Sequence, residues 1–188
     1  GNYAPNPALK LAKLLAGMKD DDGRVTIPGF YEGVTITAAD KKSFAEIPEN
    51  MAEINAEIGI AEAEKVGASY QEAMQYPSLN IRGLRASNIG KQVTTTIPNM
   101  AIAELDLRLV PETPGPRQIS LIKNYLIQHG VTLIDSLPTD AQRAKYKTLA
   151  TLQQKEGSLP FRTPMDSEIG LWLSKATERA VGKFLKVR

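Results

Sequence analysis

Apolar residues recur at helical spacing in three stretches of the chain. The first follows Asn6 and Pro7, a favourable N-cap and first helical residue, and has Leu11, Leu15 and Met18 on one stripe. The second contains Ile119, Ile122 and Leu126 and runs towards Gly130, its expected C-cap. The third follows Asp166 and Ser167, which can cap it, and places Ile169, Trp172, Leu173, Ala176 and Ala180 on one face.

Other stretches alternate between apolar and polar residues, which is typical of half-buried strands. The strictest alternation covers residues 101–109, where one face is apolar and much of the other is charged. Shorter segments with strand character are 24–27, 78–83, 93–97 and 131–134. A one-sided sheet with short connections is usually antiparallel. The pattern therefore predicts an α+β fold, a two-layer sandwich in which two helices cover one face of a four-stranded antiparallel sheet (ferredoxin-like).

Two regions do not fit this repeating pattern. Residues 38–75 contain eight acidic residues against three lysines, and Pro48, Gly59 and Gly67 interrupt their helical periodicity. We predict two or three short helices there, in an excursion from the sheet with a solvated acidic surface. Residues 136–165 are rich in proline, glycine and polar residues and are predicted to be a connector, with a short helix over 140–153. The predicted organisation is a domain over 1–135, the connector, and a last helical segment over 166–188.

Length and composition narrow the possible chemistry. A compact chain of this mass would expose roughly 9,000 Å² of surface and could bury one sound core. The chain has no Cys and a single His, His129, so it offers no disulfide, no thiolate and no multi-His metal site. The net charge of +2 is no signature of nucleic-acid binding, and the predicted sheet face lacks the aromatic pair on which RNA bases stack. No apolar run approaches the ~20 residues of a membrane span.

Few side chains stand out as candidates for binding. His129 lies at a predicted helix end, where a cation is favourable, with no nucleophile signature nearby. Residues 88–91 read as an ordinary connection between strands. Arg108 lies on the polar face of the best strand, near its end, and an Arg fork suits a carboxylate or phosphate. Thr95 offers a hydroxyl to the same anion. Pairing of Arg108 with Glu104 or Asp106 is the alternative from the residues alone.

Five short segments occur in an order that matches a known family. They are YAPNPAL at 3–9, GRVTIPGFY at 23–31, YPSLNIRG at 76–83, TTIP at 95–98 and LRLVP at 107–111. Together they resemble the lid, or dimerization, domain of the dinuclear-zinc metallopeptidases of the carnosine dipeptidase, carboxypeptidase G and succinyl-diaminopimelate desuccinylase family. The carnosinase-like branch looks most similar. The resemblance covers 1–135 well and 166–188 loosely.

The resemblance implies a lid inserted into a zinc-binding catalytic domain that lies outside this chain. Two zinc ions would belong to the full-length enzyme and none to this fragment, which would be inactive alone. Arg108 matches the lid Arg that binds the terminal carboxylate of a peptide or N-acyl amino acid substrate. Thr95 matches the lid Thr or Asn that hydrogen-bonds substrate, often across the homodimer. Thr94 departs from the branch, which commonly has Lys there.

One alternative stays open on the sequence alone. A stand-alone ferredoxin-like module that binds a small ligand or a protein partner would also explain the α+β pattern. Flanking zinc-ligand motifs in the gene would favour the lid, whereas nearby start and stop codons would favour the module. No signal peptide is visible at the start of this chain, which does not show the N-terminus of the full protein. We expect a cytoplasmic protein.

Overall fold

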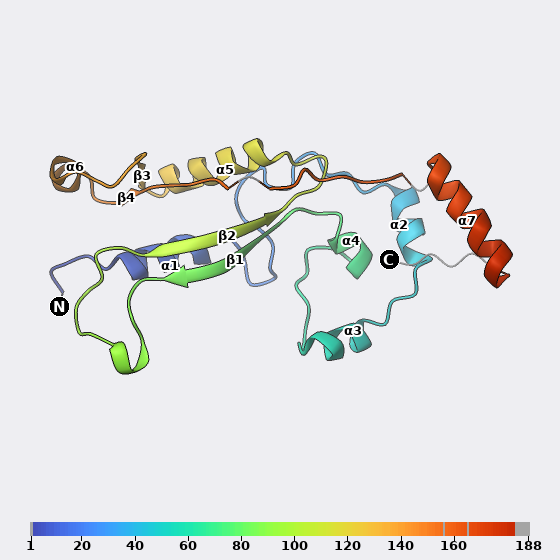
Figure 1. The fold of residues 1–188 in the computed structure, drawn as a ribbon, viewed down its shortest axis with the longest axis horizontal. Coiled ribbons are helices and arrows are strands. Elements are labelled where there is room, and N and C mark those ends of the chain that lie inside the picture. Colours follow the sequence, from blue (N-terminus) through green and yellow to red (C-terminus); the bar gives the residue numbers. More distant parts are fainter. Residues whose placement is uncertain (1, 156, 165, 183–188) are drawn as a thin grey trace.

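The computed structural model describes residues 2–155, 157–164 and 166–182. The elements in chain order, labelled in Figure 1, are α1 (Pro7–Ala16), α2 (Ala38–Ala45), α3 (Met51–Ile58), α4 (Tyr70–Ala73), β1 (Ser78–Arg85), a 3-10 turn (Gly90–Gln92), β2 (Ile102–Arg108), α5 (Gly115–Gln128), β3 (Thr132–Leu133), α6 (Asp140–Lys145), β4 (Leu149–Ala150) and α7 (Glu168–Val181).

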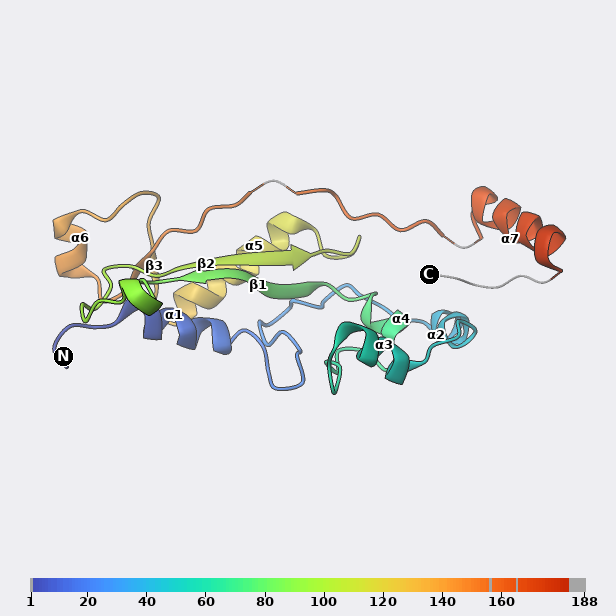
Figure 2. The same ribbon diagram turned by 60° about the horizontal axis from the view of Figure 1, so that its bottom comes forward.

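The centre of the molecule is a hairpin of β1 and β2, with α1 and α5 packed against it (Figure 2). The antiparallel register runs from Ser78 opposite Arg108 to Arg85 opposite Ile102, with a bulge between Ile81 and Gly83. The apolar side chains of β2 at positions 103, 105 and 107 pack towards the buried residues of the two helices. The structure thus combines helices with small sheets, as the coarser part of the predicted α+β fold requires.

The buried core comes from several short segments rather than from a broad sheet. It consists of Leu15, Met18, Val25, Ile27, Phe30, Leu79, Ile122 and Tyr125. Two hydrogen bonds tie its parts together: Gln118 Nε2 donates to the Phe30 carbonyl at 3.0 Å, and the Tyr125 hydroxyl donates to the Leu14 carbonyl at 2.9 Å. Both bonds satisfy polar groups that burial would otherwise leave unpaired.

The predicted four-stranded antiparallel sheet is wrong: the described residues form two separate two-stranded sheets. Residues 93–97 lie in a loop in which Val93 and Thr95 are exposed and Ile97 is half-buried, and among the described residues they pair with no strand. Residues 24–27 contribute Val25 and Ile27 to the core, but only a single bridge, between Lys19 and Val25, replaces the expected strand pairing. The segment is bounded by the Gly23 turn and by Pro28, so it is too short for a ladder.

The last predicted strand, 131–134, also pairs differently from the expectation. Only Thr132 and Leu133 are extended, and they pair in parallel with β4. Parallel pairing needs a long crossover, which the segment containing α6 supplies. The helix predicted over 140–153 therefore ends at Lys145, since β4 takes up the residues that would have continued it.

The ends of the principal helices follow the capping residues in the sequence. Asn6 Oδ1 accepts hydrogen bonds from the N–H groups of Ala8 and Leu9, at 2.9 and 3.3 Å. Gly130, with φ of 78°, follows the end of α5 in the left-handed conformation that glycine tolerates. Ser167 Oγ accepts from the Gly170 N–H at the start of α7. The final predicted segment extends to 188, and its residues 183–188 lie outside the described residues.

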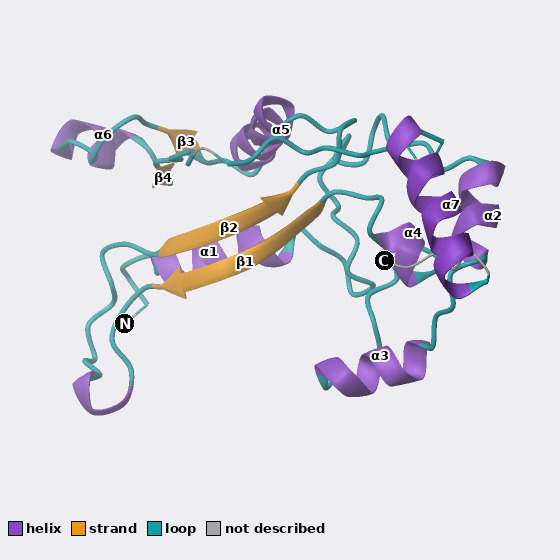
Figure 3. Ribbon diagram, turned by 45° about the vertical axis from the view of Figure 1, so that its right-hand side comes forward, coloured by secondary structure: helices purple, strands orange, loops and turns teal. Residues whose placement is uncertain are grey.

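Segments that extend away from the hairpin and its two helices make the molecule far from compact. The helices α2, α3 and α4 form the predicted excursion, and an extended segment after β4 runs the length of the molecule to α7 (Figures 1 and 3). This segment is attached by Lys155 to Glu104 at 3.2 Å, and by Arg162, which donates to both carboxylate oxygens of Glu112. The exposed surface is 14110 Å², against the roughly 9,000 Å² of a compact protein of this mass. In the part of the chain that the structure describes, large apolar side chains such as Leu9, Leu84 and Trp172 are exposed.

Candidate functional site

The outer face of the hairpin, away from the two helices, carries the charged side chains of β2. Alternation along the strand places Glu104, Asp106 and Arg108 on this face. Arg108 stands at the end of β2, with its side chain 80% exposed, and its Nε donates to Asp106 Oδ2 at 2.8 Å. The pairing expected as the alternative role for Arg108 is thus present, and it leaves the Nη groups of the guanidinium open to a ligand.

Thr95 lies at the other end of the hairpin. It is exposed in the loop between β1 and β2, beyond the pair of Arg85 and Ile102, whereas Arg108 pairs with Ser78 at the opposite end. The six residue steps along β2 correspond to about 20 Å at ~3.3 Å per residue. Within one copy of the chain, therefore, Arg108 and Thr95 do not converge on one small ligand.

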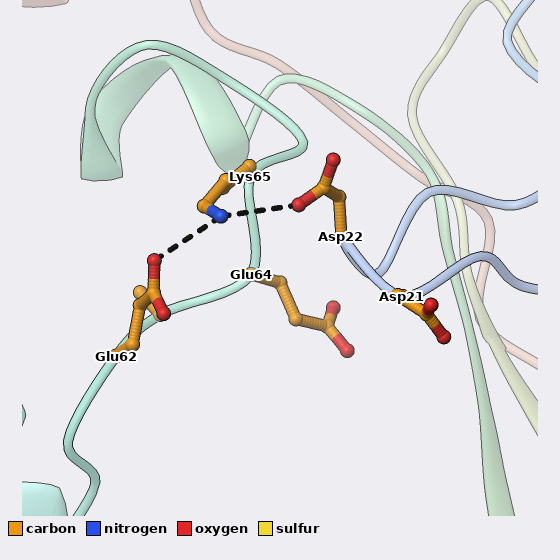
Figure 4. Close-up of a pocket in the computed structure, with 6 residues that line it drawn as sticks. Asp21, Asp22, Glu62, Glu64 and Lys65 are labelled. Carbon is orange, nitrogen blue, oxygen red and sulfur yellow. Dashed lines mark hydrogen bonds and ion pairs between the residues drawn. The ribbon is translucent and has the colours of Figure 1, made fainter.

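A polar pocket lies between the turn after α1, at Asp21 and Asp22, and residues 62–65 of the excursion (Figure 4). Lys65 Nζ lies 3.1 Å from Asp22 and 3.2 Å from Glu62, and Lys19 pairs with Glu64 at 2.6 Å. Hydrogen bonds from Lys65 to Asp22 and Glu62 raise the pKa of the lysine. Two lysines thus pair with three of the four carboxylates in the lining, and these ion pairs fasten the loop around Asp22 to the segment 62–65.

An apolar groove runs between α1 and β1. Its lining consists of Ala12, Leu15, Ala16, Lys19, Leu79, Asn80, Ile81 and Leu84. Ile81 and Leu84 are half or more exposed although they border the core. In the described part of the chain, the backbone of β1 makes no ladder other than that with β2, so its outer edge is open beside the groove. An open strand edge next to apolar surface is a site for strand pairing.

The remaining titratable candidate is His129. It is the C-cap residue of α5, its Nδ1 lies 2.8 Å from the Tyr125 carbonyl oxygen, and its ring packs on the Tyr125 ring with centroids 4.1 Å apart. Across residues 2–155, 157–164 and 166–182, no group of three or more His, Asp or Glu side chains could hold a metal ion. The described residues thus do not fit a zinc centre.

One further finding concerns membranes. The helices within the described ranges are all too short or too polar to cross a bilayer.

The described residues thus place an open strand edge beside an apolar groove, with an exposed Arg at a strand end. Residues 1–133 match the family model described as the peptidase dimerisation domain, of the M20 class. Since this match covers well over half of the chain, the protein belongs to that family, and the resemblance found in the sequence is confirmed.

Curated relatives include two kinds of dipeptidase. The chain is 25% identical over 128 residues to the Cys-Gly metallodipeptidase DUG1 of Saccharomyces cerevisiae, a match that covers 66% of this chain and 27% of the relative. It is 28% identical over 135 residues to the Beta-Ala-His dipeptidase of Mus musculus, covering 69% of this chain and 26% of the relative. The chain therefore spans about a quarter of the length of these relatives.

Solved structures share the fold. Human carnosine dipeptidase 1 matches with a TM-score of 0.74 and 18% identity, over 100% of this chain and 38% of that chain. An M20 family metallo-carboxypeptidase of Sulfolobus solfataricus, Sso-CP2, matches with a TM-score of 0.68 and 24% identity, over 96% of this chain and 44% of that chain.

Proposed function

We propose that this chain is the dimerisation and substrate-carboxylate-binding lid of a zinc-dependent dipeptidase or deacylase that hydrolyses amide bonds. The observation that carries the proposal is the match of residues 1–133 to the peptidase dimerisation domain. Relatives that bear the names of metallodipeptidases support the reaction class. The two zinc ions would be held by a catalytic domain outside this chain, and the lid alone would be inactive.

The exposed C-terminal helix supports a larger protein over a stand-alone module. Ile169, Trp172 and Leu173 of α7 are each more than half exposed, although they share the apolar stripe of the helix. An apolar stripe of this kind is normally buried. We infer that residues 1–135 are the lid, 136–165 the connector and 166–188 a segment that packs on the catalytic domain.

The hairpin geometry also supports a homodimer with shared sites. When two copies pair antiparallel through their β1 edges, the hairpin of one copy points opposite to that of the other. The loop with Thr95 of one copy then lies towards the end where the other copy carries Arg108. The two groups could thus bind one substrate across the dimer, which a single copy cannot achieve.

The dimer edge is tested by placing a charge in the groove. Ile81 is 50% exposed, so Ile81→Lys should leave the monomer folded but bury an unpaired ammonium in a β1–β1 interface. We expect the unaltered chain to be a dimer at tens of micromolar by light scattering, and the Ile81→Lys variant to be a monomer.

The matched control is Leu137→Lys, which changes an exposed apolar residue outside the groove and should stay dimeric. A monomeric unaltered chain would contradict self-association of the isolated domain. A dimeric Ile81→Lys variant would show that the dimer interface does not include the β1 edge.

A further inference from the structure

Asp106 is the direct partner of the arginine proposed to bind substrate. The two residues are two positions apart on β2, so their side chains emerge on the same face of the hairpin. Asp106 Oδ2 accepts the Nε–H of Arg108 at 2.8 Å. The Asp106 side chain is 28% exposed, whereas that of Arg108 is 80% exposed. A short, partly enclosed carboxylate thus holds a long side chain that otherwise extends into solvent.

This contact decides which part of the guanidinium can meet a ligand. An Arg can offer a carboxylate either its Nε and one Nη, or both Nη groups. Because Asp106 occupies the Nε–H, the end with both Nη groups is the one left for a bidentate carboxylate. A long side chain held this way also loses less rotamer freedom when the ligand arrives.

We propose that Asp106 is a positioning residue, which holds Arg108 with its Nη groups presented to the terminal carboxylate of the substrate. The inference rests on the proposed function, because it assigns a role only if Arg108 binds that carboxylate. The requirement is for an acceptor at the Asp106 position rather than for its negative charge. An Asn at this position retains a carbonyl oxygen for the Nε–H, whereas an Ala has no acceptor.

The test uses the full-length dimeric enzyme that carries this domain, with a dipeptide substrate and the same dipeptide as its C-terminal amide. We expect Asp106→Ala to raise KM for the free acid about 2- to 10-fold, from the freedom regained by the arginine, with little change in kcat. Asp106→Asn should restore KM to near the unaltered value, and neither variant should change KM for the amide. In an Arg108→Ala background, Asp106→Ala should have no further effect.

Glu104 provides the matched control. It is an acidic residue on the same face of the same strand, but it pairs with Lys155 and Arg82 instead of Arg108. Glu104→Ala should leave KM for both substrates unchanged.

The outcomes separate this inference from the proposed function. If Arg108→Ala raises KM for the free acid and Asp106→Ala does not, Asp106 has no positioning role. If Asp106→Asn lowers KM for the free acid, the charge of Asp106 opposes binding and the inference is overturned. An equal effect of Asp106→Ala on acid and amide would assign the residue to folding alone. If Arg108→Ala itself has no effect, the proposed function loses its carboxylate site.

Discussion

Arg108→Ala in the full-length enzyme should raise KM for dipeptides with a free terminal carboxylate by about 30- to 160-fold and leave kcat nearly unchanged. The range corresponds to about 2–3 kcal/mol for lost hydrogen bonds between charged groups, at 1.36 kcal/mol per tenfold. We expect the effect on KM because the loss of an interaction made equally in the ground state and the transition state raises KM and leaves kcat unchanged. Steady-state kinetics with the free acid and with its C-terminal amide as substrates measure this change in KM.

The amide serves as the internal control, since it has no anion for the guanidinium to bind. Arg143→Ala removes another exposed arginine, on α6, and should leave both substrates unaffected. An Arg108→Ala enzyme with an unchanged KM for the free acid would remove Arg108 from the substrate site.

Phe30→Ala should lower the free energy of unfolding of this chain by about 3–5 kcal/mol, the usual cost of deleting a buried aromatic ring. Phe30 is 1% exposed and packs edge-on against Tyr31, with ring centroids 5.3 Å apart. Its carbonyl also accepts the buried Gln118 bond. The total free energy of unfolding of a typical domain is about 5–15 kcal/mol, so the Phe30→Ala variant should be close to unfolding.

Urea unfolding followed by far-ultraviolet circular dichroism measures the loss. Fluorescence is a poorer probe, because the single Trp of the sequence, Trp172, lies exposed on α7. Phe161→Ala makes the same change at a side chain that is 87% exposed, and should alter stability by less than about 0.5 kcal/mol. Equal stabilities of the two variants would contradict the core assigned to Phe30.

Local signals in the sequence predicted local structure well. The cap at Asn6, the strict alternation of 101–109 and the apolar stripe around Ile122 correspond to α1, β2 and α5. In each case the residues that determine the element lie within it or directly beside it. The partly buried residues 103, 105 and 107 likewise follow from period two alone.

Pairing between distant segments could not be predicted in the same way. The alternation of 93–97 resembles that of a strand, but nothing in those residues tells whether another element will cover them. The partner of Thr132 and Leu133 lies beyond α6, in residues whose composition indicates only a connector. For the site, the sequence offered Glu104 or Asp106 as a partner for Arg108, and the structure selects Asp106. The separation of Arg108 from Thr95 required the register of the hairpin.

The placement of Arg108 and Thr95 at opposite ends of one hairpin has a genetic consequence for a dimer with shared sites. A substitution in one copy would impair a site that also contains a residue of the other copy. A mixed dimer of one chain without Arg108 and one chain without Thr95 would have one site that lacks both groups and one site that retains both. Two defective alleles could therefore complement each other, and half of the sites in each mixed dimer would be intact.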